Sequence, residues 1–150
     1  MHAKRAGELR PSAELLTVVG HRVPFYETDA MKIVHHANYL RYLEVARVAW
    51  MDQHDRPYRD YVAEGLHFAT TRVEIDYRRP AAFDDSLEIA TWMEWVRGAS
   101  LRMAYDVKRA GELLAVAATE HALVDESGRP RRIPKERRDR LAKRSLRVRI

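Results

Sequence analysis

The sequence is most informative between residues 26 and 39, where it reads Tyr26-Glu27-Thr28-Asp29-Ala30-Met31-Lys32-Ile33-Val34-His35-His36-Ala37-Asn38-Tyr39. The residues before it, Leu15 to Tyr26, are rich in β-branched and aromatic types, which predicts a strand. The residues after it predict a helix. The stretch is therefore interpreted as a loop that runs into a helix N-terminus, where backbone N–H groups are unpaired and carry partial positive charge.

This loop could support chemistry at a carbonyl group. A developing oxyanion can bind at a helix N-terminus, and Asp29 precedes that terminus in the same loop. A carboxylate beside an oxyanion site can activate water or attack the carbonyl directly. The alternative for Asp29 is an aspartate that only forms a turn, as this residue type often does.

The helix is predicted over Asn38 to Gln53, with Asn38 as its N-cap. Its charged residues fall on one arc of the helical wheel, and apolar residues cover the rest. The charged members are Arg41, Glu44, Arg47 and Asp52. A helix at a protein surface has a narrower apolar stripe, so we expect this one to be enclosed on most sides.

The remainder of the chain is predicted to be mainly β-structure. After a possible short helix from Tyr58 to Glu64, alternating segments predict half-buried strands. The first segment places Ala69, Thr71, Val73, Ile75 and Tyr77 on one face, the second places Leu87, Ile89, Thr91, Met93 and Trp95 on one face, and the third does so with Leu101, Met103, Tyr105 and Val107. A last strand, Glu112 to Val124, is apolar on both faces.

Short joins connect these later strands. Those at Arg97-Gly98 and Ala110-Gly111 have room only for hairpins, which makes the sheet antiparallel. A mostly apolar helix and one antiparallel sheet must bury each other, and the simplest packing curls the sheet around the helix. The predicted fold class is α+β.

Composition narrows the function. The 150 residues, 46% of them hydrophobic, suit one domain over 1–150, with peripheral tails at 1–12 and 136–150. The absence of cysteine excludes disulfides, thiolate metal sites and cysteine nucleophiles, and fits a cytoplasmic protein. We expect no secretory signal and no transmembrane segment. The sequence has no G-x-S-x-G, Walker A or G-x-G-x-x-G motif, so no serine-hydrolase elbow and no cofactor are predicted.

The net charge of +5 is concentrated between Arg129 and Arg149. This run is either a solvated tail or a contact for nucleic acid, an anionic membrane or a phosphorylated ligand. Nucleic acid is disfavoured because no recognition fold is visible. Adjacent histidines at 35 and 36 point in different directions on a helix and lack a metal-ligand spacing, so no metal site is predicted.

A family resemblance adds to this interpretation. Thr28-Asp29-Ala30-Met31, then Val34, His36, Ala37, Asn38-Tyr39-Leu40-Arg41-Tyr42 and Glu44, resembles the signature of the 4-hydroxybenzoyl-CoA thioesterase family of hotdog proteins. The resemblance implies a hotdog fold, in which an antiparallel sheet wraps around a central helix, and acyl-CoA thioester hydrolysis. It also implies a homodimer with active sites at the interface, assembling further to a homotetramer.

The same resemblance assigns roles to residues. Asp29 takes the place of the catalytic carboxylate, and the backbone amide of His36, possibly with that of Ala37, polarises the thioester carbonyl. His35 is a candidate for orienting water or substrate, or for capping the helix. The candidates for binding substrate or CoA are Lys32, Asn38, Tyr39, Arg78, Arg79, Arg131 and Arg132, the arginines because guanidinium groups suit phosphates.

One residue departs from the family pattern. Family members commonly have glycine where this chain has Lys32, and glycine tolerates positive φ. Lysine there predicts a changed loop or a different acyl pocket. Two other functions stay open at this point: hydrolysis of an acyl group carried by an acyl carrier protein, and a hotdog module that binds acyl-CoA without turnover.

Overall fold

The computed structural model describes residues 9–146 of the 150. The elements in chain order are β1 (Thr17–Arg22), α1 (Asn38–His54), α2 (Tyr58–Ala63), β2 (Leu66–Tyr77), β3 (Ser86–Arg97), β4 (Ser100–Arg109), β5 (Glu112–Asp125) and α3 (Lys135–Arg144). Short 3₁₀ turns at Ala13–Leu15 and Phe25–Glu27 flank β1. The predicted central helix is confirmed to within one residue at its C-terminus.

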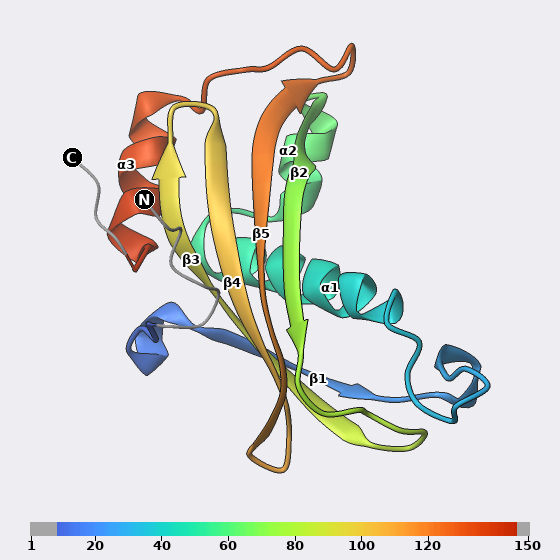
Figure 1. Cartoon of the computed structure of the whole chain (residues 1–150). Coiled ribbons are helices and arrows are strands. Elements are labelled where there is room, and N and C mark those ends of the chain that lie inside the picture. The colour runs from blue at the N-terminus through green and yellow to red at the C-terminus, as the bar shows by residue number, and fades with distance from the viewer. Residues whose placement is uncertain (1–8, 147–150) are drawn as a thin grey trace, which may run out of the picture.

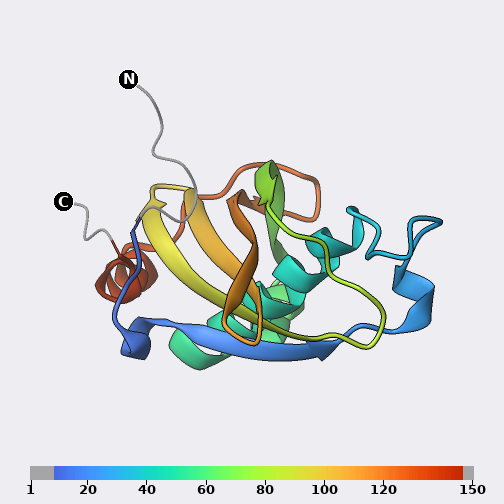
Figure 2. The same cartoon turned by 60° about the horizontal axis from the view of Figure 1, so that its bottom comes forward.

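The strands form one antiparallel sheet in the order β1-β3-β4-β5-β2. The hairpins β3–β4 and β4–β5 are those predicted from the short joins. In contrast, β2 does not pair with β3, which follows it in the chain, but with β5. Figure 1 shows α1 crossing behind the strands, and Figure 2 shows the sheet bending around it. The α+β hotdog arrangement is thus confirmed.

The core lies between α1 and the concave face of the sheet. From α1 it takes Tyr39, Tyr42, Leu43, Ala46, Trp50 and Met51, and from the sheet residues such as Leu87, Ile89, Leu101, Met103 and Tyr105. The prediction that α1 is enclosed on most sides is wrong for the single chain taken alone, because its residues Leu40 and Val45 are 45% and 60% exposed. A single sheet covers one side of a helix and leaves the opposite side open.

Two β-bulges alter the predicted faces. A shift in pairing between Thr70 and Arg72 makes Thr71 an extra residue, so Phe68 and Thr70 share the inner face with Val73. The prediction that Ala69 and Thr71 lie on that face is therefore wrong, because one extra residue reverses the side chains on its two sides relative to each other. A second shift between Met93 and Trp95 likewise moves Trp95 to the outer face, opposite Arg102.

The chain after β5 is not only a solvated tail. Leu141 of α3 is fully buried, and the Leu146 N–H donates to the Met93 carbonyl at 2.8 Å. Arg137 of α3 reaches the buried carboxylate of Asp55 at 2.9 Å. Residues 136–146 were expected to be peripheral but pack against β3, because Leu141 supplies an apolar contact within a charged segment. Residues 1–8 and 147–150 lie outside the described part of the chain.

None of the helices within residues 9–146 is both long enough and apolar enough to cross a bilayer.

Candidate active site

The loop that carries Asp29 closes on itself between β1 and α1. Thr28 and Val34 form an antiparallel bridge, and the Asp29 N–H donates to the Ile33 carbonyl at 2.9 Å. The Lys32 N–H donates back to the Asp29 carbonyl at 2.9 Å, and Lys32 has a φ of 65°. The lysine therefore holds the left-handed conformation that glycine adopts without steric cost. This chain therefore has lysine in place of the family's common glycine, at a position whose backbone conformation is the one that glycine adopts most easily.

Asp29 is both a turn-forming residue and a pocket residue. Its Oδ1 accepts from the Met31 N–H at 2.8 Å, which is an Asx turn. Within the described residues Oδ2 has no hydrogen-bond partner. One oxygen thus fixes the carboxylate, and the other remains available to a water molecule or substrate.

A pocket of about 370 Å³ opens beside this carboxylate. Asp29, His36 and Tyr39 from the loop and the start of α1 share it with Arg78 and Arg79, which follow β2. Met31, Ile33, Val34 and Pro80 give it an apolar lining. The fold therefore brings together five of the residues predicted from the sequence, although about 50 positions separate the first from the last.

The His36 N–H points out of the helix start. The carbonyl of the preceding residue, His35, accepts from the Asn38 N–H at 2.9 Å and so faces the first turn. Carbonyl and N–H point in opposite directions across a trans peptide, so the His36 N–H faces away from that turn. Among residues 9–146 it has no protein acceptor. It is a free donor on a residue that lines the pocket.

The neighbouring predicted groups are already engaged. The Ala37 N–H donates to His35 Nδ1 at 3.1 Å, so this amide is not free to serve as a second oxyanion donor. His35 thereby caps the helix, which was one of the two roles considered for it, and its ring stacks on that of His36. Asn38 is not the N-cap: its side-chain Nδ2 donates to the Glu27 carbonyl at 2.8 Å and ties the helix to the loop.

Glu27 does not line the pocket, but its carbonyl holds the start of α1, and the sequence did not reveal this role. Its side chain is buried and accepts hydrogen bonds from the Tyr42 hydroxyl and from His21 Nε2. Burial and the bond to Glu27 raise the pKa of Tyr42 above its usual value. Nothing in the spacing distinguishes this glutamate from a solvated one, because its partners come from β1 and from the second turn of α1.

Arg131 and Arg132 lie far from this pocket within one chain. The Arg131 N–H donates to the Leu123 carbonyl near the end of β5, and its side chain pairs with Asp125. The pocket lies at the opposite end of that strand, where the Arg78 N–H donates to the Leu114 carbonyl. A single chain therefore does not unite these two arginines with Asp29.

The part of the chain that the structure describes contains no group of three histidine, aspartate or glutamate side chains placed to hold a metal ion.

Comparison with known proteins gives a consistent family assignment. Residues 23–141 match the sequence profile of the Thioesterase-like superfamily. A putative esterase of Aquifex aeolicus is 36% identical over 115 residues, covering 77% of this chain and 89% of that protein. The putative acyl-CoA thioesterase YneP of Bacillus subtilis is 34% identical over 110 residues, covering 72% and 80%.

Solved structures of similar proteins agree with this family assignment. A hypothetical protein from Thermus thermophilus superposes with a TM-score of 0.82 at 32% identity, covering 88% of this chain and 99% of that one. A probable thioesterase from Bartonella henselae gives 0.74 at 31% identity, covering 79% and 99%.

Proposed function

This chain belongs to the thioesterase-like superfamily and is a thioester hydrolase, and we propose that it hydrolyses acyl-CoA with Asp29 as the catalytic carboxylate. The observation that carries the proposal is that the carboxylate of Asp29 and the residue with the free amide, His36, line one pocket.

The proposed chemistry uses both groups at one carbonyl. The thioester carbonyl oxygen accepts from the His36 N–H, which stabilises the negative charge that develops when the carbonyl carbon is attacked. Oδ2 of Asp29 either takes a proton from the attacking water or attacks the carbon itself and forms an acyl-enzyme anhydride that water then cleaves. In both routes the C–S bond breaks, the thiolate of CoA leaves, and the acid is released.

The choice of CoA as the carrier rests on names and charge. Relatives named acyl-CoA thioesterases or acyl-CoA thioester hydrolases include YneP and the YbgC protein of Escherichia coli, which is 34% identical over 116 residues. Arg78 and Arg79 are exposed and line the pocket, and Lys32 is exposed in the adjoining loop. These cations suit the phosphates of the CoA nucleotide. Asn38 and Tyr39 would complete the contacts at the acyl end.

We further propose that two chains pair through β2 to complete the site. In the part of the chain that the structure describes, β2 is an edge strand, and Val73 and Tyr77 on it are 42% and 49% exposed. A two-fold axis across this edge would pair the strands antiparallel. The end of one β2 that lies near Arg131 and Arg132 would then approach the other chain's pocket. Two such dimers would form the tetramer that the resemblance implies.

The decisive experiment is the Asp29→Asn variant assayed on a panel of acyl-CoA esters, with free thiol as the readout. Asparagine can still accept from the Met31 N–H, so the turn should persist. We expect kcat to fall by about 10²-fold or more, as for loss of a general base or nucleophile, with melting temperature unchanged. The matched control is Asp139→Asn on the exposed face of α3.

Two results would count against the proposal: wild-type activity in Asp29→Asn, or no turnover of any ester by the wild-type enzyme. The same acyl groups on an acyl carrier protein form a second arm. Faster turnover there than with CoA would move the substrate class to carrier-bound acyl groups.

A further inference from the structure

Tyr77, the last residue of β2, contacts the start of α1. Its hydroxyl donates to the His36 carbonyl at 2.9 Å. Its ring meets the ring of Tyr39 edge-on, with centroids 5.0 Å apart at 89°, and the ring of His36 in a similar way at 6.4 Å. Tyr77 also lines the pocket that contains Asp29. The end of the edge strand β2 thus contacts the N-terminus of α1 beside the pocket.

The backbone on either side of the His36 N–H is held by separate hydrogen bonds. On the N-terminal side, the His35 N–H donates to the Glu27 carbonyl at 2.8 Å, and the His35 carbonyl, in the same peptide group as the His36 N–H, accepts from the Asn38 N–H at 2.9 Å. On the C-terminal side, the His36 carbonyl accepts from the Tyr77 hydroxyl. Its other contact in the described part of the chain is the Tyr39 N–H at a long 3.3 Å. The Ala37 N–H of the same peptide group also donates, to His35 Nδ1 at 3.1 Å. Of these three hydrogen bonds on the C-terminal side in the described part of the chain, the one from Tyr77 is the shortest, and it is the one that comes from a distant strand.

We propose that Tyr77 is a positioning residue that fixes the direction of the His36 amide. This inference rests on the proposed function, since it gives that amide an orientation to keep. An oxyanion donor is effective only when it is aimed in advance at the place where charge develops. Burial raises the pKa of Tyr77, so its hydroxyl stays protonated and able to donate at neutral pH.

A direct role for Tyr77 in binding substrate is less well supported. The residue is 49% exposed, but the side-chain hydroxyl, its one polar side-chain group, already donates to the His36 carbonyl. A hydroxyl in that position cannot donate to a substrate without releasing the loop. The two roles differ in kinetics: loss of a substrate contact raises KM, whereas loss of transition-state alignment lowers kcat.

The test is Tyr77→Phe, which keeps the ring and removes the hydroxyl. We expect kcat on the best acyl-CoA to fall about tenfold, less than the 10²- to 10³-fold typical of removing an oxyanion donor outright, with KM within about twofold. The control is Tyr58→Phe, which removes another hydrogen bond between a tyrosine hydroxyl and the backbone. In the wild type, the Tyr58 hydroxyl accepts from the Phe68 N–H at 3.1 Å. We expect Tyr58→Phe to lower stability slightly and leave kcat unchanged.

A second readout does not depend on turnover. ¹⁵N relaxation should show the His36 amide as mobile in Tyr77→Phe and ordered in the wild type and in Tyr58→Phe. If Tyr77→Phe retains wild-type kcat and an ordered His36 amide while Asp29→Asn is inactive, the inference fails and the proposed function stands. A rise in KM at constant kcat would also overturn it. If no ester is turned over, the proposed function fails, and the relaxation data alone decide what Tyr77 does.

Discussion

The carboxylate of Asp29 forms a turn and still has an oxygen available for the catalytic role that we propose. One carboxylate oxygen closes the Asx turn, and the other has no partner within residues 9–146. The turn holds the carboxylate in place, so little side-chain entropy remains to be lost when a substrate binds. The two interpretations of this residue, structural and catalytic, are therefore compatible.

Lys32, in the same loop, has a backbone conformation that lowers the stability of the fold. Its φ of 65° places a residue with a Cβ in the left-handed region, at a cost of about 1 kcal/mol. We expect Lys32→Gly to raise the free energy of unfolding by about 0.5 kcal/mol, because relief of this cost exceeds the extra chain entropy of glycine. Urea denaturation measures the change.

Lys108→Gly in β4 is the comparison for that variant, since a glycine inside a strand should lower the free energy of unfolding by about 1 kcal/mol. Equal losses in the two variants would show that the left-handed conformation of Lys32 carries no cost.

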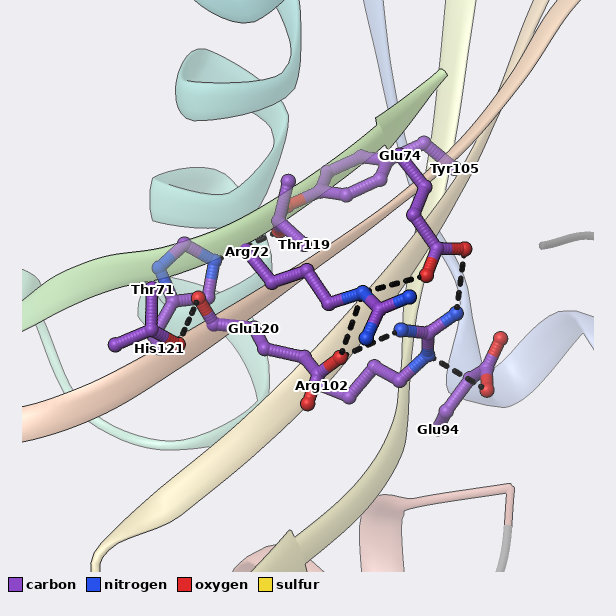
Figure 3. A network of polar contacts seen from close by, with 9 residues as sticks. All are labelled: Thr71, Arg72, Glu74, Glu94, Arg102, Tyr105, Thr119, Glu120 and His121. Atoms are coloured by element: carbon purple, nitrogen blue, oxygen red, sulfur yellow. Dashed lines mark hydrogen bonds and ion pairs between the residues drawn. The ribbon is translucent and has the colours of Figure 1, made fainter. Parts of the chain in front are cut away.

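An ion network on the outer face joins several strands. Figure 3 shows Arg102 of β4 between Glu74 of β2, Glu94 of β3 and Glu120 of β5. Arg102 is 5% exposed, and its shortest contact is 2.9 Å, to Glu120. Arg72, which is more exposed, bridges Glu74 and Glu120 from the same side. The network thus neutralises carboxylates that the strand order brings together.

Removing the buried cation should be costly. We expect Arg102→Met to lower the free energy of unfolding by about 3 kcal/mol, because carboxylates would remain crowded and partly buried without their cation. Arg72→Met, at the exposed edge of the same network, should cost less than about 1 kcal/mol. Chemical denaturation of both variants tests this order, and equal effects would show that Arg102 is not the central residue.

A buried histidine links α1 to β2 and β5. His121 of β5 lies between Thr70 Oγ1 at 3.2 Å and Thr119 Oγ1 at 2.7 Å, with the guanidinium of Arg47 at 3.4 Å. Burial, and then the charge of Arg47, lower the pKa of His121 to about 3. Between the usual pKa near 6.5 and this value, only the unfolded chain binds the proton.

The stability contributed by the neutral His121 is therefore complete above about pH 6.5 and decreases as the pH falls below it. We expect a slope of up to about 1.4 kcal/mol per pH unit between pH 6.5 and 5. His121→Gln, which cannot titrate, should flatten the slope in urea denaturation series. His54, whose pKa burial also lowers, contributes with the same sign, so some slope should remain. An unchanged slope would contradict the assignment.

The molecule as a whole has an open side. Leu40 of α1 and Val73 of β2 are exposed and line one shallow pocket beside this edge strand. A second copy paired through β2 would cover this edge and bring Arg131 and Arg132 towards the other chain's Asp29. Subunit mixing distinguishes this arrangement from a site built within one chain.

We expect Arg131→Ala/Arg132→Ala to raise KM for acyl-CoA with little change in kcat. Coexpressed with Asp29→Asn, it should form mixed dimers in which one of the two sites has both Asp29 and the arginines. Half of the dimers are mixed, and one of the two sites in each is intact, so one quarter of all sites are intact. At low substrate concentration, activity should therefore recover to about one quarter of the wild-type value. Activity equal to the average of the parents would place the arginines in the same chain's site or outside any site.

Much of the architecture was predictable from local patterns. The central helix, the hairpins and the loop with Asp29 before a helix N-terminus all follow from periodicity, turn residues and the family signature. The five residues that meet in the pocket were also among the candidates from the sequence. The helix, the hairpins and the loop depend on residues close together in the chain, whose preferences are expressed before the tertiary structure forms, whereas only the fold brings the five pocket residues into contact with one cavity.

Other features required the tertiary structure. The pairing of β2 with β5, the extra residue Thr71, the buried Glu27 and the contact of Tyr77 with His36 all join segments that are distant in the chain. The separation of Arg131 from the pocket belongs to the same group. The sequence alone determined which segments are helix, strand and loop, because these depend on short-range steric and hydrogen-bonding preferences. The fold decided which segments meet, because that depends on how the whole chain buries its apolar surface at once.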